Sequence, residues 1–185
     1  MLRLFIGLEL PIAIQDRLEP LCSGLRDARW VTPHNMHITL GFVGDVDEGA
    51  ARDLHETLGD IRFDPFELYL SEVDCFAHKK QPTIVWAGVK GDLDALHHLY
   101  SKTLKAIELA GLEPERRKYK PHVTLARMKQ MPKEKLLSYM EANNFFKTDS
   151  FEVSHFAQFR SHLTRHGADY EVLARYGSDP SKTQF

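Results

Sequence analysis

The sequence predicts an α+β protein with two pseudo-symmetric lobes, each an antiparallel β-sheet with helices on its outside, that face each other across a central groove. One observation behind this prediction is that His-Ile-Thr-Leu at residues 37–40 recurs as His-Val-Thr-Leu at residues 122–125. Another is that strand and helix patterns follow one another in the same order in both halves. We therefore expect a single domain over residues 1–185, with repeats at about residues 2–73 and 83–176.

Length, composition and charge are those of an ordinary globular domain. The chain has 185 residues, 43% of them hydrophobic, and a formal net charge of −2. This charge disfavours a protein that coats long nucleic acids, although a local basic patch is compatible with it. The apolar stretch at residues 2–14 is interrupted by charged residues and a proline, and it is shorter than the roughly 20 residues of a membrane span. It does not have the pattern of a signal peptide either.

The two cysteines predict the compartment. Cys22 and Cys75 lie far apart and form no CxxC or other metal-ligand spacing. Reduced thiols are typical of the cytosol. We therefore expect a cytoplasmic protein, monomeric and without a membrane segment.

The first half of the chain has clear boundary residues. Pro11 opens a helical pattern, which Pro20 should kink or shorten because proline disrupts a helix interior. Gly44 and Asp45 are expected to end the strand that carries the first motif. The expected order is a strand at residues 2–10, a helix from residue 11, turn residues at 32–35, a strand from residue 37, a helix at 47–58 and a strand at 66–73.

The second half repeats this order. Asp92 is a good N-cap and Gly111 a good end for the helix between them. Pro132 should open the next helix. The expected elements are a strand at residues 83–89, a helix at 93–110, the strand of the second motif, a helix from 132 to about 144, and a hairpin of strands 151–159 and 170–176 joined by 162–167, followed by a frayed tail at 177–185.

Each repeated motif divides its residues between two faces of a strand. Successive side chains point to opposite faces, so His37 and Thr39 share one face, as do His122 and Thr124. The intervening branched apolar residues face the core. The alternative interpretation is that each histidine bonds a neighbouring carbonyl and each threonine is present for its β propensity.

Two histidines facing each other suit a reaction in which a proton is removed at one point and delivered at another. The ordinary pKa of histidine is about 6.5, so one imidazole can be neutral and the other charged near neutral pH. Thr39 and Thr124 can donate hydrogen bonds to an oxyanion between them. A phosphate diester would satisfy all four groups.

Further stretches, at residues 3–8, 30–35, 42–44, 85–86 and 119–127, add to these motifs. With them the chain resembles the 2H phosphoesterase superfamily, and most closely its LigT-like RNA 2′,3′-cyclic phosphodiesterases, also called 2′-5′ RNA ligases. The resemblance covers nearly the whole chain. It implies a two-lobed α+β fold, a metal-free active groove with no cofactor, and hydrolysis of ribose 2′,3′-cyclic phosphate ends of RNA or small nucleotides to the 2′-phosphate, with weak reversible 2′-5′ ligation.

The resemblance also implies roles for single residues. His37 is the general acid facing the leaving O3′, and His122 is the general base facing the attacking water. Thr39, Thr124 and Arg127 bind the phosphate. Arg127 lies five residues from His122, which is the wrong face of a regular strand, so a bulge or a strand end must bring it round. The alternative is an exposed charge at a strand end.

Other residues offer weaker signals. Phe5, Tyr119 and Trp86 are candidates for stacking on a base, with core packing as the alternative. The basic run that ends at Lys120 could contact an RNA backbone or form a solvated edge. The remaining histidines and the acidic residues do not form a metal-ligand set, so we expect no metal.

Three functions remain open at this point. The predicted function is an RNA-end cyclic phosphodiesterase. A ligase that joins RNA halves would use the same site, and the direction depends on its substrates. A non-catalytic nucleotide-binding module is the third alternative, disfavoured because both His-x-Thr pairs are intact. A cyclic-nucleotide hydrolysis assay would separate these classes.

Overall fold

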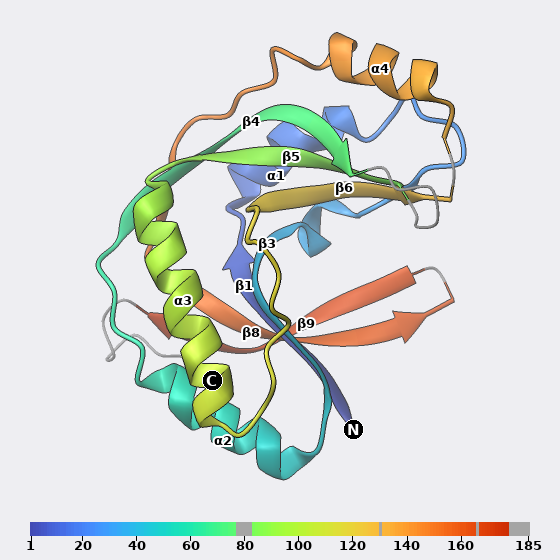
Figure 1. Cartoon of the computed structure of the whole chain (residues 1–185). Coiled ribbons are helices and arrows are strands. Elements are labelled where there is room, and N and C mark those ends of the chain that lie inside the picture. Colours follow the sequence, from blue (N-terminus) through green and yellow to red (C-terminus); the bar gives the residue numbers. More distant parts are fainter. Residues whose placement is uncertain (77–82, 130, 166, 178–185) are drawn as a thin grey trace.

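The computed structural model describes residues 1–76, 83–129, 131–165 and 167–177 and consists of one curled antiparallel sheet with helices along its outside (Figure 1). The strands are β1 (Leu2–Glu9), β2 (Arg29–Trp30), β3 (His37–Val46), β4 (Phe66–Phe76), β5 (Thr83–Gly91), β6 (His122–Met128), β7 (Phe151–Val153), β8 (His155–Thr164) and β9 (Gly167–Gly177). The α-helices are α1 (Ile12–Leu18), α2 (Glu48–Gly59), α3 (Leu93–Leu109) and α4 (Lys133–Ala142), with short 3₁₀ turns at Glu19–Leu21 and Pro33–Asn35. The α+β class predicted from the sequence is confirmed.

The two halves of the sheet meet at a narrow junction. The strand order is β7-β4-β5-β6-β3-β1-β8-β9, and β2 pairs with β6 beside this path. Between β3 and β6 the ladder has one pair of partners, Ile38 and Val123. The two facing sheets expected from the sequence are therefore the two arms of one continuous sheet, and both repeated motifs lie at the point where the arms join.

Each arm combines strands from both halves of the sequence. β4, from the first half, pairs with β5, and β8, from the second half, pairs with β1. β4 thus lies in the arm of the second motif, and β8 and β9 lie in the arm of the first motif. This exchange ties the two halves of the chain together, and residues of both halves share one main core.

The two faces of the sheet have different environments. Leu4, Ile6 and Leu8 of β1 lie in the main core, beneath the helices, whereas Phe5 belongs to a separate cluster with Ala157 and Phe159. On β3, Gly41 lies so close to α3 that an added Cβ would stand 2.9 Å from the Ile107 side chain. We call the side that carries Phe5 the open face, because α2 and α3 cover the other side (Figure 1).

Several local predictions are confirmed. The carboxylates of Asp47 and Asp92 accept hydrogen bonds from the backbone N–H groups of the third residue of α2 and α3, at 2.9 and 3.0 Å. Gly111, which follows the C-cap residue of α3, has φ +76°, a conformation that favours glycine. α1 ends at Leu18, and Pro20 lies in the 3₁₀ turn that follows, so the expected shortening occurs.

Other boundaries were wrong. The strand expected at residues 151–159 is divided at Ser154, because β7 pairs with β4 while β8 pairs with β1. The loop expected at residues 162–167 is mostly strand, since the β8–β9 ladder continues to Thr164 and Gly167. Gly177 ends β9 rather than beginning a tail, and residues 178–185 lie outside the described residues. Among the described residues, no helix has the length and apolar character to cross a membrane.

Candidate active site

β3 and β6 present their motifs on the open face in the same way. In both strands the histidine and threonine are half-buried, and the residue between them is fully buried. The Ile38–Val123 pair fixes the register at the junction. The histidine and threonine on either side of this pair, His37 and Thr39 on β3 and His122 and Thr124 on β6, lie on the face opposite the core. The structure therefore brings together the four residues that the repeated motif singled out.

A β-bulge follows the motif in each strand. In β6, Trp86 and Val85 of β5 pair with Thr124 and Ala126, so Leu125 is the extra residue. The bulge leaves Leu125 and Ala126 both buried and returns Arg127 to the exposed side. The bulge that a phosphate-binding Arg127 requires is thus present, and this arginine shares the open face with His122.

The same bulge occurs in the first motif. Gly7 and Ile6 of β1 pair with Thr39 and Gly41, so Leu40 is skipped. The next exposed position after this bulge is Phe42. The backbone is therefore repeated more faithfully than the sequence, and the position that holds an arginine in one arm holds an aromatic ring in the other.

Both imidazoles are oriented by one type of hydrogen bond. His37 Nδ1 lies 2.8 Å from the backbone oxygen of Asn35, and His122 Nδ1 lies 2.7 Å from that of Lys120. A carbonyl oxygen only accepts, so Nδ1 of each ring carries the proton and donates it. In the neutral ring, Nε2 is then left with a free lone pair, which makes it the atom available for proton transfer.

Asn35 is itself held in place by its backbone and by its side chain. It closes a 3₁₀ turn, and its buried side chain forms two hydrogen bonds with β9. Nδ2 donates to the Ala168 oxygen, and Oδ1 accepts from the Tyr170 N–H, both at 3.2 Å. The carbonyl that orients His37 is thus held by the β8–β9 hairpin, a role that the sequence pattern did not reveal.

Both histidines have lowered pKa values. Burial is the main cause for His37, with further contributions from the charges of His122 and Arg127, and together they outweigh the hydrogen bond to Asn35 and bring the pKa to about 4. Burial also lowers the pKa of His122, helped by nearby Arg117, Arg127 and Lys120. At pH 7, both imidazoles are therefore neutral in the free protein.

Aromatic rings surround each imidazole. His37 lies 4.7 Å from the Phe5 ring and meets Tyr170 edge-on at 5.2 Å, measured between ring centroids. Phe5 is only 4% exposed and stacks on Phe159, so it supports His37 and leaves little surface for a base. Gly7 completes this arrangement, because an added Cβ would stand 2.9 Å from the backbone oxygen of Ile38 and 3.5 Å from the His37 ring.

The rings beside His122 come from the other arm. Phe76 meets His122 edge-on at 5.1 Å, and Trp86 lies 5.9 Å away. Lys120 Nζ lies over both rings, 5.2 Å from the Phe76 centroid and 4.7 Å from that of Trp86. Phe76 was not found from the sequence, because it lies on a different strand from the motif and no local pattern marks it.

Tyr119 holds the two motif strands together. Its hydroxyl donates to the backbone oxygen of Thr39 at 3.0 Å, and its ring stacks on Tyr100 with centroids 3.9 Å apart. Burial raises its pKa. These contacts occupy the ring and the hydroxyl, so Tyr119 packs and positions β3.

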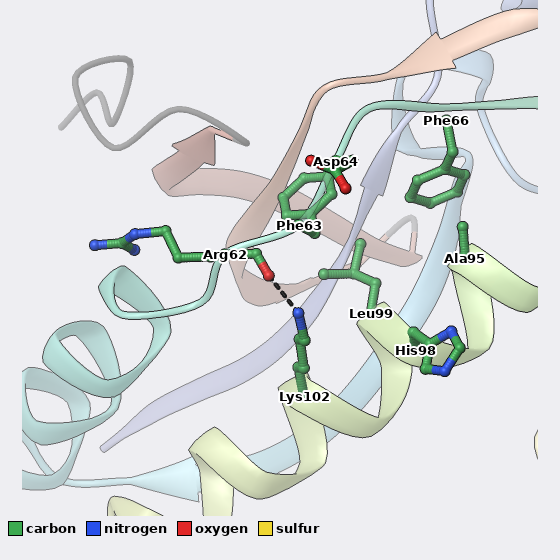
Figure 2. A pocket seen from close by; sticks show the side chains of 8 residues that line it. All are labelled: Arg62, Phe63, Asp64, Phe66, Ala95, His98, Leu99 and Lys102. Carbon is green, nitrogen blue, oxygen red and sulfur yellow. Dashed lines mark hydrogen bonds between the residues drawn. The ribbon is translucent and has the colours of Figure 1, made fainter.

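Two hollows lie apart from the motif residues. One, of about 430 Å³, lies between α3 and the segment before β4, where Lys102 donates to the backbone oxygen of Arg62 (Figure 2). The other, of about 470 Å³, includes Glu9, His155 and Arg175. Neither contains a residue of the two motifs.

Glu9 anchors a charged cluster beside β3. Arg175 Nε and Nη2 donate to its two carboxylate oxygens at 2.7 and 2.8 Å, and His155 Nε2 lies 3.2 Å away. Burial would raise the pKa of Glu9, but the hydrogen bonds from His155 and Arg175 outweigh it and lower the pKa to about 2. In the part of the chain that the structure describes, no three His, Cys, Asp or Glu side chains are grouped so as to hold a metal ion.

Comparison with known proteins agrees with this geometry. The sequence matches the family described as "LigT like Phosphoesterase" over residues 8–86 and 91–170. The chain belongs to this family. An Aeropyrum pernix relative named RNA 2′,3′-cyclic phosphodiesterase is 34% identical over 146 residues, which cover 77% of this chain and 82% of that protein. A relative of the same name from Archaeoglobus fulgidus is 30% identical over 180 residues, covering 93% and 98%.

Solved structures of other proteins have the same fold. E. coli LigT complexed with 3′-AMP superposes with a TM-score of 0.77 at 23% identity, covering 95% of this chain and 97% of that one. A protein from Thermus thermophilus gives a TM-score of 0.75 at 25% identity over 95% and 97% of the two chains. The fold that the LigT-like resemblance implied is therefore confirmed.

Proposed function

We propose that this protein is an RNA 2′,3′-cyclic phosphodiesterase, which hydrolyses a ribose 2′,3′-cyclic phosphate end to a 2′-phosphate. The observation that carries the proposal is the pair of His-x-Thr strands joined at Ile38 and Val123, with Nδ1 of each histidine bonded to a carbonyl. Such a pair can supply a base and an acid from one face of a sheet. The names of the relatives support the substrate class.

In this proposal, His122 Nε2 takes a proton from the attacking water and His37 Nε2–H protonates the leaving O3′. His37, with a pKa of about 4, must gain its proton when the substrate binds. A phosphate charge about 4 Å away contributes about 4 kcal/mol at an effective dielectric constant of 20. That is enough to bring the pKa of His37 back to roughly 7, because 1.36 kcal/mol corresponds to one pKa unit.

The other residues of the site bind the phosphate. Thr39 and Thr124 donate hydroxyl hydrogen bonds to its oxygens, and the planar guanidinium of Arg127 binds two of them. The charge of Arg127 lowers the pKa of both histidines, which supports a position between them. Lys120 is the candidate for contact with the rest of the nucleotide.

We further propose that the protein acts as a monomer in the cytoplasm, on RNA ends or small nucleotides that carry the cyclic phosphate. Both histidines belong to one chain, and Cys22 and Cys75 are free thiols. A ligase using the same residues would have to exclude water from the site. A non-catalytic binding module would have no use for two oriented imidazoles.

Hydrolysis of a 2′,3′-cyclic nucleotide tests the proposal. His37→Ala and His122→Ala should each lower the rate by ~10²-fold or more, because each removes one proton-transfer group. Activity should persist in a chelator. Full activity in either variant would contradict the two-histidine mechanism, and a chelator-sensitive rate restored by added metal would contradict its metal independence.

A further inference from the structure

Arg127 has a second arginine directly beside it. In the β2–β6 ladder, Arg29 is the Cα partner of Arg127, and Trp30 is the partner of Ala126. Directly opposed residues of an antiparallel pair have their side chains on the same face. Trp30 and Ala126 contribute to the main core, so Arg29 and Arg127 both project on the opposite, open face.

This pairing places two like charges together without a counter-charge. Like charges directly opposite each other destabilise a β-ladder. Both arginines are exposed, and neither has a carboxylate partner or a hydrogen-bond acceptor among the described residues. An anion bound between the two guanidinium groups would remove the repulsion.

The strand that carries Arg29 is firmly held. Val31 N–H donates to the Leu125 oxygen at 2.8 Å, at the bulge of β6. The Trp30 ring packs against Tyr139, with centroids 6.0 Å apart. The backbone of Arg29 is therefore fixed relative to Arg127, even though β2 is only two residues long.

The two arginines lie on different strands. Arg127 follows the second motif on β6, and its charge contributes to the lowered pKa of both histidines, so it lies beside the expected position of the scissile phosphate. Arg29 lies on the neighbouring strand β2, which carries no motif residue. A site next to that phosphate but outside its immediate surroundings suits the adjoining phosphodiester of a polynucleotide.

We propose that Arg29 forms a subsite for the second phosphate of the substrate, beside Arg127, which binds the scissile phosphate. The preferred substrate is then an RNA end with at least one internucleotide phosphodiester beyond the cyclic phosphate, rather than a cyclic mononucleotide. This inference rests on the proposed phosphodiesterase function and extends it to a substrate length.

The test compares two substrates, a 2′,3′-cyclic mononucleotide and a diribonucleotide with a 2′,3′-cyclic end. Arg29→Gln should lower kcat/KM for the diribonucleotide about tenfold and change that for the mononucleotide less than about twofold. Arg26→Gln is the matched control, because Arg26 is exposed on the segment before β2 and its replacement removes the same charge. It should leave the ratio of the two rates unchanged.

Binding provides a readout that does not depend on turnover. A diribonucleotide ending in a 2′-phosphate should bind Arg29→Gln more weakly than wild type, and its affinity should depend less steeply on salt concentration, because one charged contact is lost. Equal losses on both substrates, or equal behaviour of the Arg29 and Arg26 variants, would overturn the subsite. If wild type hydrolyses neither substrate, the proposed function fails, and the binding measurement alone decides whether Arg29 holds a phosphate.

Discussion

Replacing His37 by asparagine should change how the stability of the protein depends on pH. Asparagine places an amide N–H near the position of Nδ1, so it can still donate to the Asn35 oxygen, but it does not titrate. The pKa of His37 is about 4 in the folded protein and 6.5 ordinarily. Between these values the unfolded chain binds a proton and the folded protein does not, so stability rises with pH through this window.

The size of the effect follows from the two pKa values. Relative to the variant, wild type should lose about 3 kcal/mol of unfolding free energy between pH 7 and pH 4, and the loss should be nearly complete at pH 4. Urea denaturation followed by tryptophan fluorescence at pH 7, 6, 5 and 4 measures it. His98→Asn, which removes an exposed histidine of α3, is the control and should follow wild type.

Parallel curves for wild type and His37→Asn would refute the reasoning, because they would mean that His37 is protonated as easily in the folded protein as in the unfolded chain. A difference confined to values below pH 4 would refute it as well. Such a result would place the effect of this imidazole outside the window between its folded and unfolded pKa values.

Three further outcomes are expected. Arg127→Lys should lower kcat/KM by ~10-fold or more, because an ammonium cannot form the planar two-point contact of a guanidinium with phosphate. The control Arg116→Lys should keep a kcat/KM close to that of wild type. Equal effects of the two substitutions would make Arg127 an ordinary exposed charge. A substrate with sulfur at the 3′ bridging position should restore much of the rate of His37→Ala and little of that of His122→Ala, because a thiolate leaves without a proton; rescue of the His122 variant would reverse the roles. Glu9→Gln should lower the unfolding free energy at pH 7 by about 1–3 kcal/mol. It should also reduce the loss of stability between pH 4.5 and pH 2, because in this range Glu9 is protonated in the unfolded chain but not in the folded protein. If urea denaturation shows the same loss of stability in this range for the variant and wild type, the role of the ion pair is contradicted.

Local chemistry made much of the fold predictable from the sequence. Asp47, Asp92 and Gly111 mark helix ends because they satisfy backbone groups a few residues away. Within each motif, side chains alternate between the two faces of a strand, which places the histidine and the threonine on the same face. These features depend only on neighbouring residues, so a sequence pattern can reveal them.

The features that sequence reasoning missed depend on distant partners. The break at Ser154 arises because β7 and β8 pair with strands in different arms. The ion pair between Glu9 and Arg175 joins residues at opposite ends of the chain. The juxtaposition of Arg29 with Arg127 follows from a two-residue strand with no pattern of its own. No local signal fixes any of these contacts.

The remaining question is how a symmetric scaffold assigns different roles to its two histidines. Both motif strands have the same bulge, and both imidazoles donate from Nδ1 to the carbonyl two residues earlier. The side chains on those carbonyl residues differ, because Asn35 bonds the backbone of β9 while Lys120 brings a positive charge beside His122.

The neighbouring strands add to this difference. Gly7 pairs with Thr39 and lets His37 pack onto Phe5, whereas Trp86 pairs with Thr124 at the equivalent place. His37 is thus held more deeply and relies on the substrate phosphate for its proton, as a general acid that acts only in the complex would. His122 has a lowered pKa and cationic neighbours, which keep it neutral and ready to accept a proton from water. The asymmetry of the chemistry therefore follows from a few side chains placed on a duplicated backbone.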